Sequence, residues 1–235
     1  MHRGTYGCRL PLEQCVAELA VCDRIAYHRA MRTRFLPCLP TRSVNVPATP
    51  TWLHEVKYDG YRLIVQREGE RVRLFSRNGN DWSGRYPWIV EAALKNKHNQ
   101  FVIDGEAVVL GVDGVADFNA LHSRKHNHEV QLYAFDILAL DGEDLRALPL
   151  SIRKTNLERL LARRPGGIFV APFEHGEIGP DLFRAAYDMG LEGMVEARRS
   201  PLSRRPIEGL DQGEEPQAPR DASGNGLAVD ACLRP

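Results

Sequence analysis

The sequence predicts an α+β fold, in which antiparallel sheets carry helices on their outer faces. Two observations support this class. Alternating segments at 61–65 and 71–75 lie close together in the chain, separated by turn-forming residues, as in a β-hairpin. Helical segments are interspersed among the strands, but the two do not alternate in the regular order of β-α-β units, which would indicate a parallel sheet.

The N-terminal part of the chain differs in character from the central part. Residues 1–34 form an extension to which the sequence assigns no role, although 11–32 has the pattern of a helix. Residues 35–51 are rich in proline, which excludes a helix there and favours an extended chain.

The central part contains most of the expected secondary structure. A strand at 52–57 leads into the turn pair Asp59-Gly60, and apolar, β-branched segments predict core strands at 101–110 and 131–140. Ser151 is the predicted N-cap of a helix whose leucines share one face. The expected helices are 86–94, 117–123, 151–163 and 181–189, and a short strand is expected at 168–171.

Charge and hydropathy narrow the class of protein. The 31 basic residues balance the 31 acidic ones, so composition alone does not indicate a DNA-binding protein, which usually has a positive excess; a local basic patch stays open. No apolar run reaches the length of a membrane span, and the N-terminus lacks a signal-peptide pattern. We therefore expect a cytoplasmic protein.

Lys57 is the first candidate for a reactive group. It ends a predicted strand just before a tight turn, which would project its amine into a cleft. A lysine nucleophile must lose a proton from an ammonium of pKa about 10.4, and burial or nearby cations lower that value. On this segment alone, an exposed lysine beside a turn is the more frequent arrangement.

The segment around Lys57 is not isolated. EVKYDGYR at 55–62 is followed by SRNG at 76–79, FVIDGE at 101–106, LYAFDIL at 132–138 and LEGMV at 191–195. In this order and spacing, the segments resemble the motifs of the covalent nucleotidyltransferases, which are the ATP-dependent ligases and the mRNA capping enzymes. The flanking segments are most similar to the bacterial DNA ligases of non-homologous end joining, and the resemblance covers residues 35–195.

This resemblance implies an ATP-grasp-like nucleotidyltransferase fold of two antiparallel sheets flanked by helices, with Lys57 at the floor of a cleft between them. It implies an adenylation domain in which Lys57 forms lysyl-AMP with ATP and passes AMP to the 5′-phosphate of nicked double-stranded DNA. The expected context is DNA repair and recombination at the nucleoid, by a monomer that works with end-joining proteins.

The resemblance also assigns roles to individual residues. Arg62 and Arg77 hold ribose or phosphate, for which the planar and permanently charged guanidinium is suited. Glu106 and Glu192 meet the ribose or a divalent ion, Mg²⁺ or Mn²⁺, and such a sparse pair of carboxylates suits magnesium. Phe135 stacks on adenine, and Glu55 lies beside the base.

Alternatives remain for some of these residues. Phe135 lies in an apolar strand and is equally consistent with a simple core residue, and Arg77 with a hairpin edge. The histidines at 122, 126 and 128 have a spacing that could bind a metal, but short histidine-rich tracts are weak signals, and a solvated loop is favoured.

The chain departs from the family after Val195. Glu196 and Ala197 stand where the fourth motif continues through a lysine, no Lys-x-Lys motif comes after it, and no lysine occurs after Lys154. These lysines would neutralise the α-phosphate. We expect the oligonucleotide-binding domain that comes next in the family to be absent as well.

Residues 196–235 are rich in Pro, Gly and charged residues without apolar periodicity, and we interpret them as a disordered tail. A frameshift would explain the tail. Codons for residues 195–215 can be chosen so that the frame one base later encodes SKRADRPYRAGRSKDWIKVKN, the ligase continuation with both missing motifs. We hypothesise a frameshift near Val195, which resequencing this stretch of the gene would test.

The sequence leaves three functional hypotheses. The chain is an active ligase adenylation domain, a catalytically inactive ligase remnant that lacks the later lysines, or a capping or RNA ligase-type nucleotidyltransferase. The third is disfavoured by the flanking segments, and purine preference distinguishes it, because ATP labels a ligase and GTP a capping enzyme.

Overall fold

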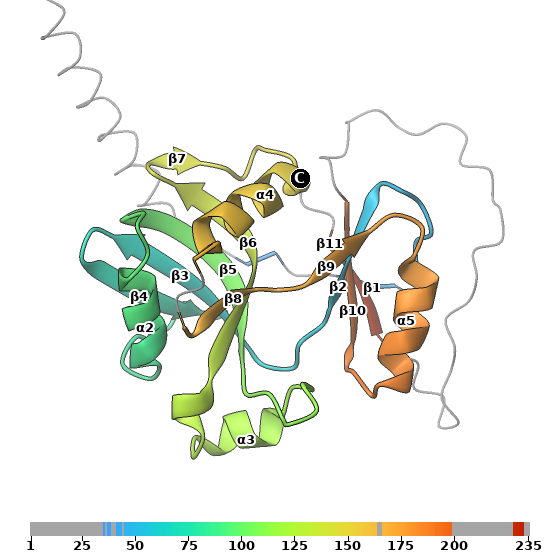
Figure 1. Cartoon of the computed structure of the whole chain (residues 1–235), viewed down its shortest axis with the longest axis horizontal. Coiled ribbons are helices and arrows are strands. Elements are labelled where there is room, and N and C mark those ends of the chain that lie inside the picture. Colours follow the sequence, from blue (N-terminus) through green and yellow to red (C-terminus); the bar gives the residue numbers. More distant parts are fainter. Residues whose placement is uncertain are drawn as a thin grey trace, which may run out of the picture.

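The computed structural model describes residues 35, 37–38, 41–43, 45–163, 166–198 and 228–232 of the chain. This part consists of a five-stranded and a six-stranded sheet with helices packed against them (Figure 1). Neighbouring strands are antiparallel except for β6–β8 and β10–β11, which are parallel. The predicted α+β class with two antiparallel sheets is therefore confirmed.

The six-stranded sheet has the order β4-β3-β5-β6-β7, and β8 pairs with β6 beside it. Gly69 closes the hairpin between β3 and β4 with a φ of +60°, a conformation that favours glycine. The strands are β3 (Tyr61–Glu68), β4 (Arg71–Ser76), β5 (Gln100–Val108), β6 (Gln131–Leu140), β7 (Glu143–Asp144) and β8 (Ile168–Val170).

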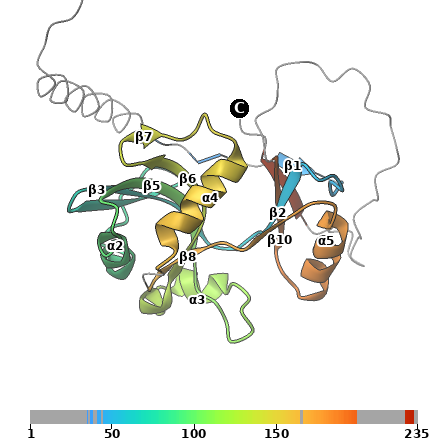
Figure 2. The same ribbon diagram turned by 45° about the horizontal axis from the view of Figure 1, so that its top comes forward.

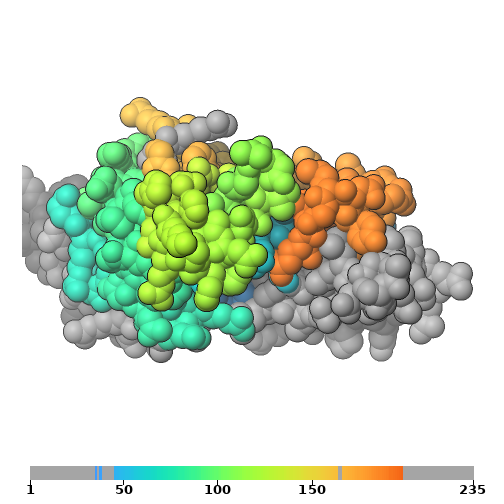
Figure 3. Space-filling model, turned by 90° about the horizontal axis from the view of Figure 1, so that it is seen from below, coloured from blue at the N-terminus to red at the C-terminus, as the bar shows by residue number. Residues whose placement is uncertain are grey.

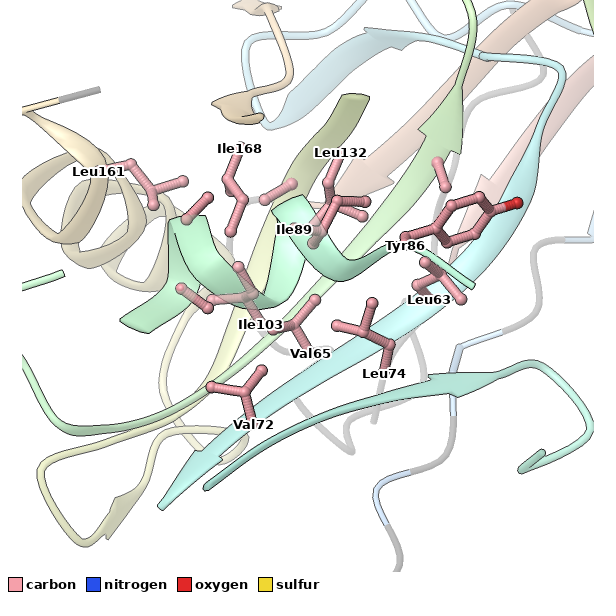
Figure 4. Close-up of a cluster of buried hydrophobic side chains, with 14 of the residues drawn as sticks. Leu63, Val65, Val72, Leu74, Tyr86, Ile89, Ile103, Leu132, Leu161 and Ile168 are labelled. Atoms are coloured by element: carbon pink, nitrogen blue, oxygen red, sulfur yellow. The ribbon is translucent and has the colours of Figure 1, made fainter. Parts of the chain in front are cut away.

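The main core lies on one face of this sheet, under α2 (Pro87–Leu94) and α4 (Leu150–Leu161) (Figure 4). Alternate residues of β3, such as Leu63 and Val65, point into it. Ile64 points to the opposite face, where it joins a smaller cluster with Val102 and Phe35. Because each fully buried side chain of this size contributes about 1.5–3 kcal/mol, the central strands are firmly held on both faces.

The connection from β5 to β6 contains α3 (Phe118–Ser123) and the 3₁₀ helix η1 (Asn127–Glu129). Asp117 caps α3, since its side chain accepts a hydrogen bond of 2.8 Å from the backbone N–H of Ala120. The predicted short helix at this place is therefore present.

The five-stranded sheet has the order β1-β11-β10-β2-β9. Helix α5 (Gly179–Asp188) packs against it, with Phe183 and Ala186 buried beside Met194 and Val46. The strands are β1 (Thr41–Ser43), β2 (Trp52–Val56), β9 (Phe173–His175), β10 (Gly193–Arg198) and β11 (Ala228–Cys232).

Two predictions need correction. Strand β10 continues through residues 196–198, and 228–232 form β11, so these parts of the predicted disordered tail are strands. They are ordered by pairing with β2 and with each other, which local composition does not reveal. Helix α4 begins at Leu150 after Pro149, so Ser151 lies in its first turn rather than at its N-cap. The predictions for residues 1–34, 199–227 and 233–235 lie outside the described residues.

Candidate active site

A cavity of about 700 Å³ is lined by residues from both sheets. In the space-filling view, the segments near residues 118–130 (green) and near β10 and α5 (orange) face each other across a hollow, with blue atoms of the early chain visible inside (Figure 3). All the residues that the sequence assigned to nucleotide, metal or catalysis line this cavity, namely Glu55, Lys57, Arg62, Arg77, Glu106, Phe135 and Glu192.

Lys57 comes directly after β2, in the segment that crosses from the five-stranded to the six-stranded sheet. Its backbone N–H donates to the carbonyl of Gly193 at 3.0 Å, which continues the pairing of β2 with β10. Its Nζ lies 2.9 Å from Glu192 Oε1, and the two side chains are 28% and 38% exposed. The amine is thus held at the cavity wall, and it is accessible to a ligand.

The turn after Lys57 requires glycine. A Cβ atom at Gly60 would lie 2.3 Å from the carbonyl oxygen of Ala107, so only glycine lets the turn approach β5 this closely. This close approach brings the start of β3 against β5 and fixes where Lys57 enters the cavity.

Arg62 is fixed on two sides. Its Nε and Nη2 donate to Asp104 at 2.6 and 3.0 Å, a bidentate pair with a fully buried carboxylate. Its guanidinium also lies 4.2 Å from the centre of the Phe135 ring. Sequence analysis did not identify Asp104, although a charged residue inside the apolar segment at 101–106 was a signal for it.

Phe135 lies at an irregularity of β6. Asp104 of β5 pairs with Asp136 and Gly105 with Ala134, so Phe135 has no partner on β5. Such a bulge changes the direction of side chains, and here Phe135 and Asp136 both line the cavity. Phe135 is half-buried at the cavity wall, so it is not the core residue of the alternative interpretation.

Glu106 lies opposite Arg62 on β5. Burial raises the pKa of the Glu106 carboxyl to about 8, Arg62 opposes this shift, and the charges of Asp104, Glu192 and Asp59 add to it. These three carboxylates are therefore close enough to Glu106 to interact with it electrostatically. Glu106 and Glu192, the predicted metal pair, thus interact electrostatically, although Glu106 lies on β5 and Glu192 directly precedes β10 of the other sheet.

Two cations of α4 that sequence analysis missed hold the walls of the cavity. Arg153 forms a bidentate, buried pair with Asp136, with distances of 2.9 and 3.2 Å. Lys154 Nζ lies 2.7 Å from Glu55 Oε2. The leucines of this segment indicated a helix, but nothing local showed that the adjacent Arg-Lys pair faces buried carboxylates.

Successive side chains at the end of β10 face either the cavity or the buried opposite side of the sheet. Val195 and Ala197 line the cavity, whereas Glu196 points to the other face and is fully buried. There Glu196 forms an ion pair with Nδ1 of His54, whose Nε2 lies 2.9 Å from the carbonyl oxygen of Gly176. A residue at position 197 therefore faces the cavity, and in this chain it is an alanine.

The histidine-rich loop makes local contacts. His126 and His128 each pair with Glu129, and Nδ1 of His122 lies 2.8 Å from the Tyr61 hydroxyl. Among the described residues, no group of three or more His, Cys, Asp or Glu side chains is arranged to hold a metal ion. None of the described helices is long and apolar enough to cross a membrane.

Comparison with known proteins identifies relatives of the chain. A family model for the ATP dependent DNA ligase domain matches residues 40–199. The multifunctional non-homologous end joining protein LigD of Pseudomonas aeruginosa is 37% identical over 158 residues, which are 66% of this chain and 19% of the relative. LigD of Mycolicibacterium smegmatis is 34% identical over 162 residues, which are 68% of this chain and 21% of the relative.

Solved structures agree with these relatives. The mycobacterial DNA ligase D complexed with ATP and MES has a TM-score of 0.62 and 29% identity, with coverage of 84% of this chain and 60% of that chain. The ligase domain of M. tuberculosis LigD also has a TM-score of 0.62 and 29% identity, with coverage of 83% and 58%. The chain spans about a fifth of the curated relatives and about three fifths of these solved chains.

The family model covers more than half of the chain, and its bounds include every candidate site residue that lines the cavity. This chain therefore belongs to the ATP-dependent DNA ligase domain family and is similar to the ligase domains of the end-joining LigD proteins.

Proposed function

We propose that this chain is a ligase adenylation domain whose nucleophile is Lys57. The Lys57 nitrogen forms a bond to the α-phosphorus of ATP, the bond from that phosphorus to the bridging oxygen breaks, and pyrophosphate leaves. The resulting lysyl-AMP passes AMP to the 5′-phosphate of nicked double-stranded DNA, which a 3′-hydroxyl then attacks to release AMP.

One observation carries this proposal: the Lys57 amine lies at the wall of a single cavity that also contains groups suited to each part of ATP. Phe135 offers a ring face for the base, and Arg62 and Arg77 offer permanent charge for ribose and phosphate. Charge spreads over the phosphorus during transfer, so cations placed in advance favour the reaction.

A divalent cation fits the acidic end of the cavity. Magnesium prefers one or two carboxylates together with water and substrate phosphate, and Glu106 and Glu192 are such a pair. When bound, Mg²⁺ or Mn²⁺ would supply positive charge to the phosphates. Glu192 Oε1 also lies 2.9 Å from Lys57 Nζ, so the candidate metal ligand and the candidate nucleophile are direct neighbours.

Ala197 favours a second candidate function, an inactive remnant that binds ATP without reacting. In the described part of the chain, the cations that line the cavity are Lys57, Arg62 and Arg77. A lysine at position 197 would add a charge at this wall, where alanine offers none. Loss of one charged or hydrogen-bonding group at a transition state typically lowers the rate by about 10²–10³-fold.

Self-adenylation tests both candidates. Purified protein is incubated with α-labelled ATP and magnesium and resolved on a denaturing gel, with Lys57→Ala, Ala197→Lys and the double variant alongside. We expect weak label in the wild type, about 10–100-fold more in Ala197→Lys, and none in either protein without Lys57. Label that persists in Lys57→Ala excludes this nucleophile. No label in a folded Ala197→Lys variant that still binds ATP shows that the chain is a remnant.

The later steps and the cellular setting belong to the same proposal. Label should move from the adenylated protein to the 5′-phosphate of a nicked duplex, and GTP should not replace ATP. We further propose that the protein is a monomer that acts at the nucleoid in the cytoplasm, in DNA repair and recombination with end-joining proteins as partners. Pull-down of such proteins on broken DNA would test this setting.

A further inference from the structure

Helix α4 connects the two sheets through adjacent residues. Arg153 reaches Asp136 on β6 of the six-stranded sheet, and Lys154 reaches Glu55 on β2 of the five-stranded sheet. Figures 1 and 2 both show α4 lying on the larger sheet at the side nearer to the smaller one. Both carboxylates line the nucleotide cavity, so α4 anchors the two walls from behind.

Lys154 is an unusual lysine because its side chain is only 2% exposed. Its Nζ lies 2.7 Å from Glu55 Oε2 and 4.8 Å from the centre of the Phe173 ring. Phe173 is the direct neighbour of Glu55 across β2 and β9, so the ammonium is held between an anion and a ring face. A buried ammonium persists only when such partners compensate its lost hydration.

Other charges act on Glu55 from a greater distance. Arg62 and Glu196 interact with it electrostatically. Arg62, however, donates to Asp104, and Glu196 pairs with His54 on the opposite face of the sheet. Among the described residues, Lys154 is the cation in direct contact with the Glu55 carboxylate, and it holds Oε2.

The position of Glu55 relative to Lys57 suggests which part of the nucleotide its carboxylate would contact. Glu55 and Lys57 both line the cavity and are two residues apart, which in an extended chain is roughly 6.6 Å. This separation is comparable to the reach of one ribose. If the α-phosphorus binds at Lys57, as the proposed function requires, a base one ribose away would lie beside Glu55.

We propose that Lys154 is a positioning residue for purine selection, which holds the Glu55 carboxylate in place as a hydrogen-bond acceptor facing the base. This inference rests on the proposed function. An ionised carboxylate only accepts hydrogen bonds, so it pairs with the 6-amino group of adenine and repels the 6-oxo group of guanine. A carboxylate displaced from the base would lose this discrimination, because it would neither accept from the adenine amino group nor repel the guanine oxygen.

The test is equilibrium binding of ATP and of GTP to the wild type and to Lys154→Met, which keeps the apolar stem and removes the charge. We expect the wild type to prefer ATP and Lys154→Met to reduce that ATP-to-GTP affinity ratio by about tenfold or more. Arg159→Met is the matched control, since Arg159 is exposed on the same helix and should keep the wild-type ratio.

A double variant in which both partners are neutral controls for misfolding of Lys154→Met, because it leaves no unpaired buried charge. Glu55→Gln should reduce the ratio, and Glu55→Gln with Lys154→Met should give the same ratio as Glu55→Gln alone, because Lys154 acts only through Glu55. The inference is overturned if a folded Lys154→Met variant keeps the wild-type ATP-to-GTP affinity ratio. It is also overturned if the double variant has the wild-type ratio. A wild type that binds neither nucleotide overturns the proposed function, and the inference falls with it.

Discussion

Glu106 lies where the cavity concentrates negative charge. The residue is half-buried, and desolvation of its carboxyl raises the pKa to about 8, well above the ordinary value of 4.5. At neutral pH the folded protein therefore holds Glu106 mostly protonated. In the unfolded chain the same group loses its proton near its ordinary pKa, so the two states bind different numbers of protons between pH 4.5 and 8.

The sign of the resulting pH dependence is fixed. Because the folded pKa is raised, the contribution of Glu106 to stability is fully present below pH 4.5 and is lost as pH rises through about 8. We expect Glu106→Gln, which stays neutral, to flatten the fall in melting temperature over this window. The measurement is thermal unfolding at several pH values in the presence of a chelator.

An exposed glutamate provides the control for this experiment. Glu158→Gln on the outer side of α4 should track the wild-type curve. Wild type and Glu106→Gln with parallel curves from pH 5 to pH 8 would show that Glu106 ionises in the folded protein as it does in water.

At the scale of single elements, α4 shows what a local pattern does and does not reveal. The leucines predicted a helix here, and Leu157, Leu160 and Leu161 are buried in the core as that pattern requires. The same periodicity gives no reason for Arg153 and Lys154 to be buried, because their partners lie on distant strands. Pairing over long sequence separation is thus the part of the site that sequence analysis missed.

The Arg153–Asp136 pair gives a stability prediction for this helix. Removing one partner of a buried pair leaves an uncompensated charge, which costs about 3–5 kcal/mol. We expect Arg153→Met to lower the free energy of unfolding by that amount in urea titrations. Arg153→Met with Asp136→Asn should recover most of the loss, because no buried charge remains unpaired at this contact.

Arg159→Met again serves as the comparison on α4 and should change the unfolding free energy by less than about 0.5 kcal/mol. If Arg153→Met were as mild as this exposed substitution, the pair would not anchor α4 to β6.

At the scale of the whole molecule, the sheets differ in how well the sequence predicts them. Hairpin turns and alternating segments predicted β3 to β6, which pair mostly with sequence neighbours. The smaller sheet joins β2 with β10 and β11 from the far end of the described chain, and these contacts leave no local pattern. That is why the boundary predicted at Val195 was three residues too early for β10, which ends at Arg198.

Side chains of β10 point alternately to the cavity and to the opposite face, which shows what the frameshift would change in the structure. In the other reading frame, serine would replace Glu196 and lysine would replace Ala197. The serine would fall on the buried face beside His54, and the lysine would face the cavity. The alternative sequence therefore places its cation on the side of the cavity and removes a buried carboxylate from the other side.

A chain that continues after Val195 in the other frame should self-adenylate at least about 100-fold faster than the present chain. The expected gain exceeds that of Ala197→Lys, since that frame encodes further lysines downstream. Initial rates of labelling with α-labelled ATP, with Lys57→Ala in both backgrounds, measure the difference. Equal rates in the two chains would mean that residues after Val195 do not limit the chemical step, and the inactive-remnant hypothesis would lose its physical basis. A gain that disappears with Lys57 would place the defect of this chain in its C-terminal sequence and leave the nucleotide cavity intact.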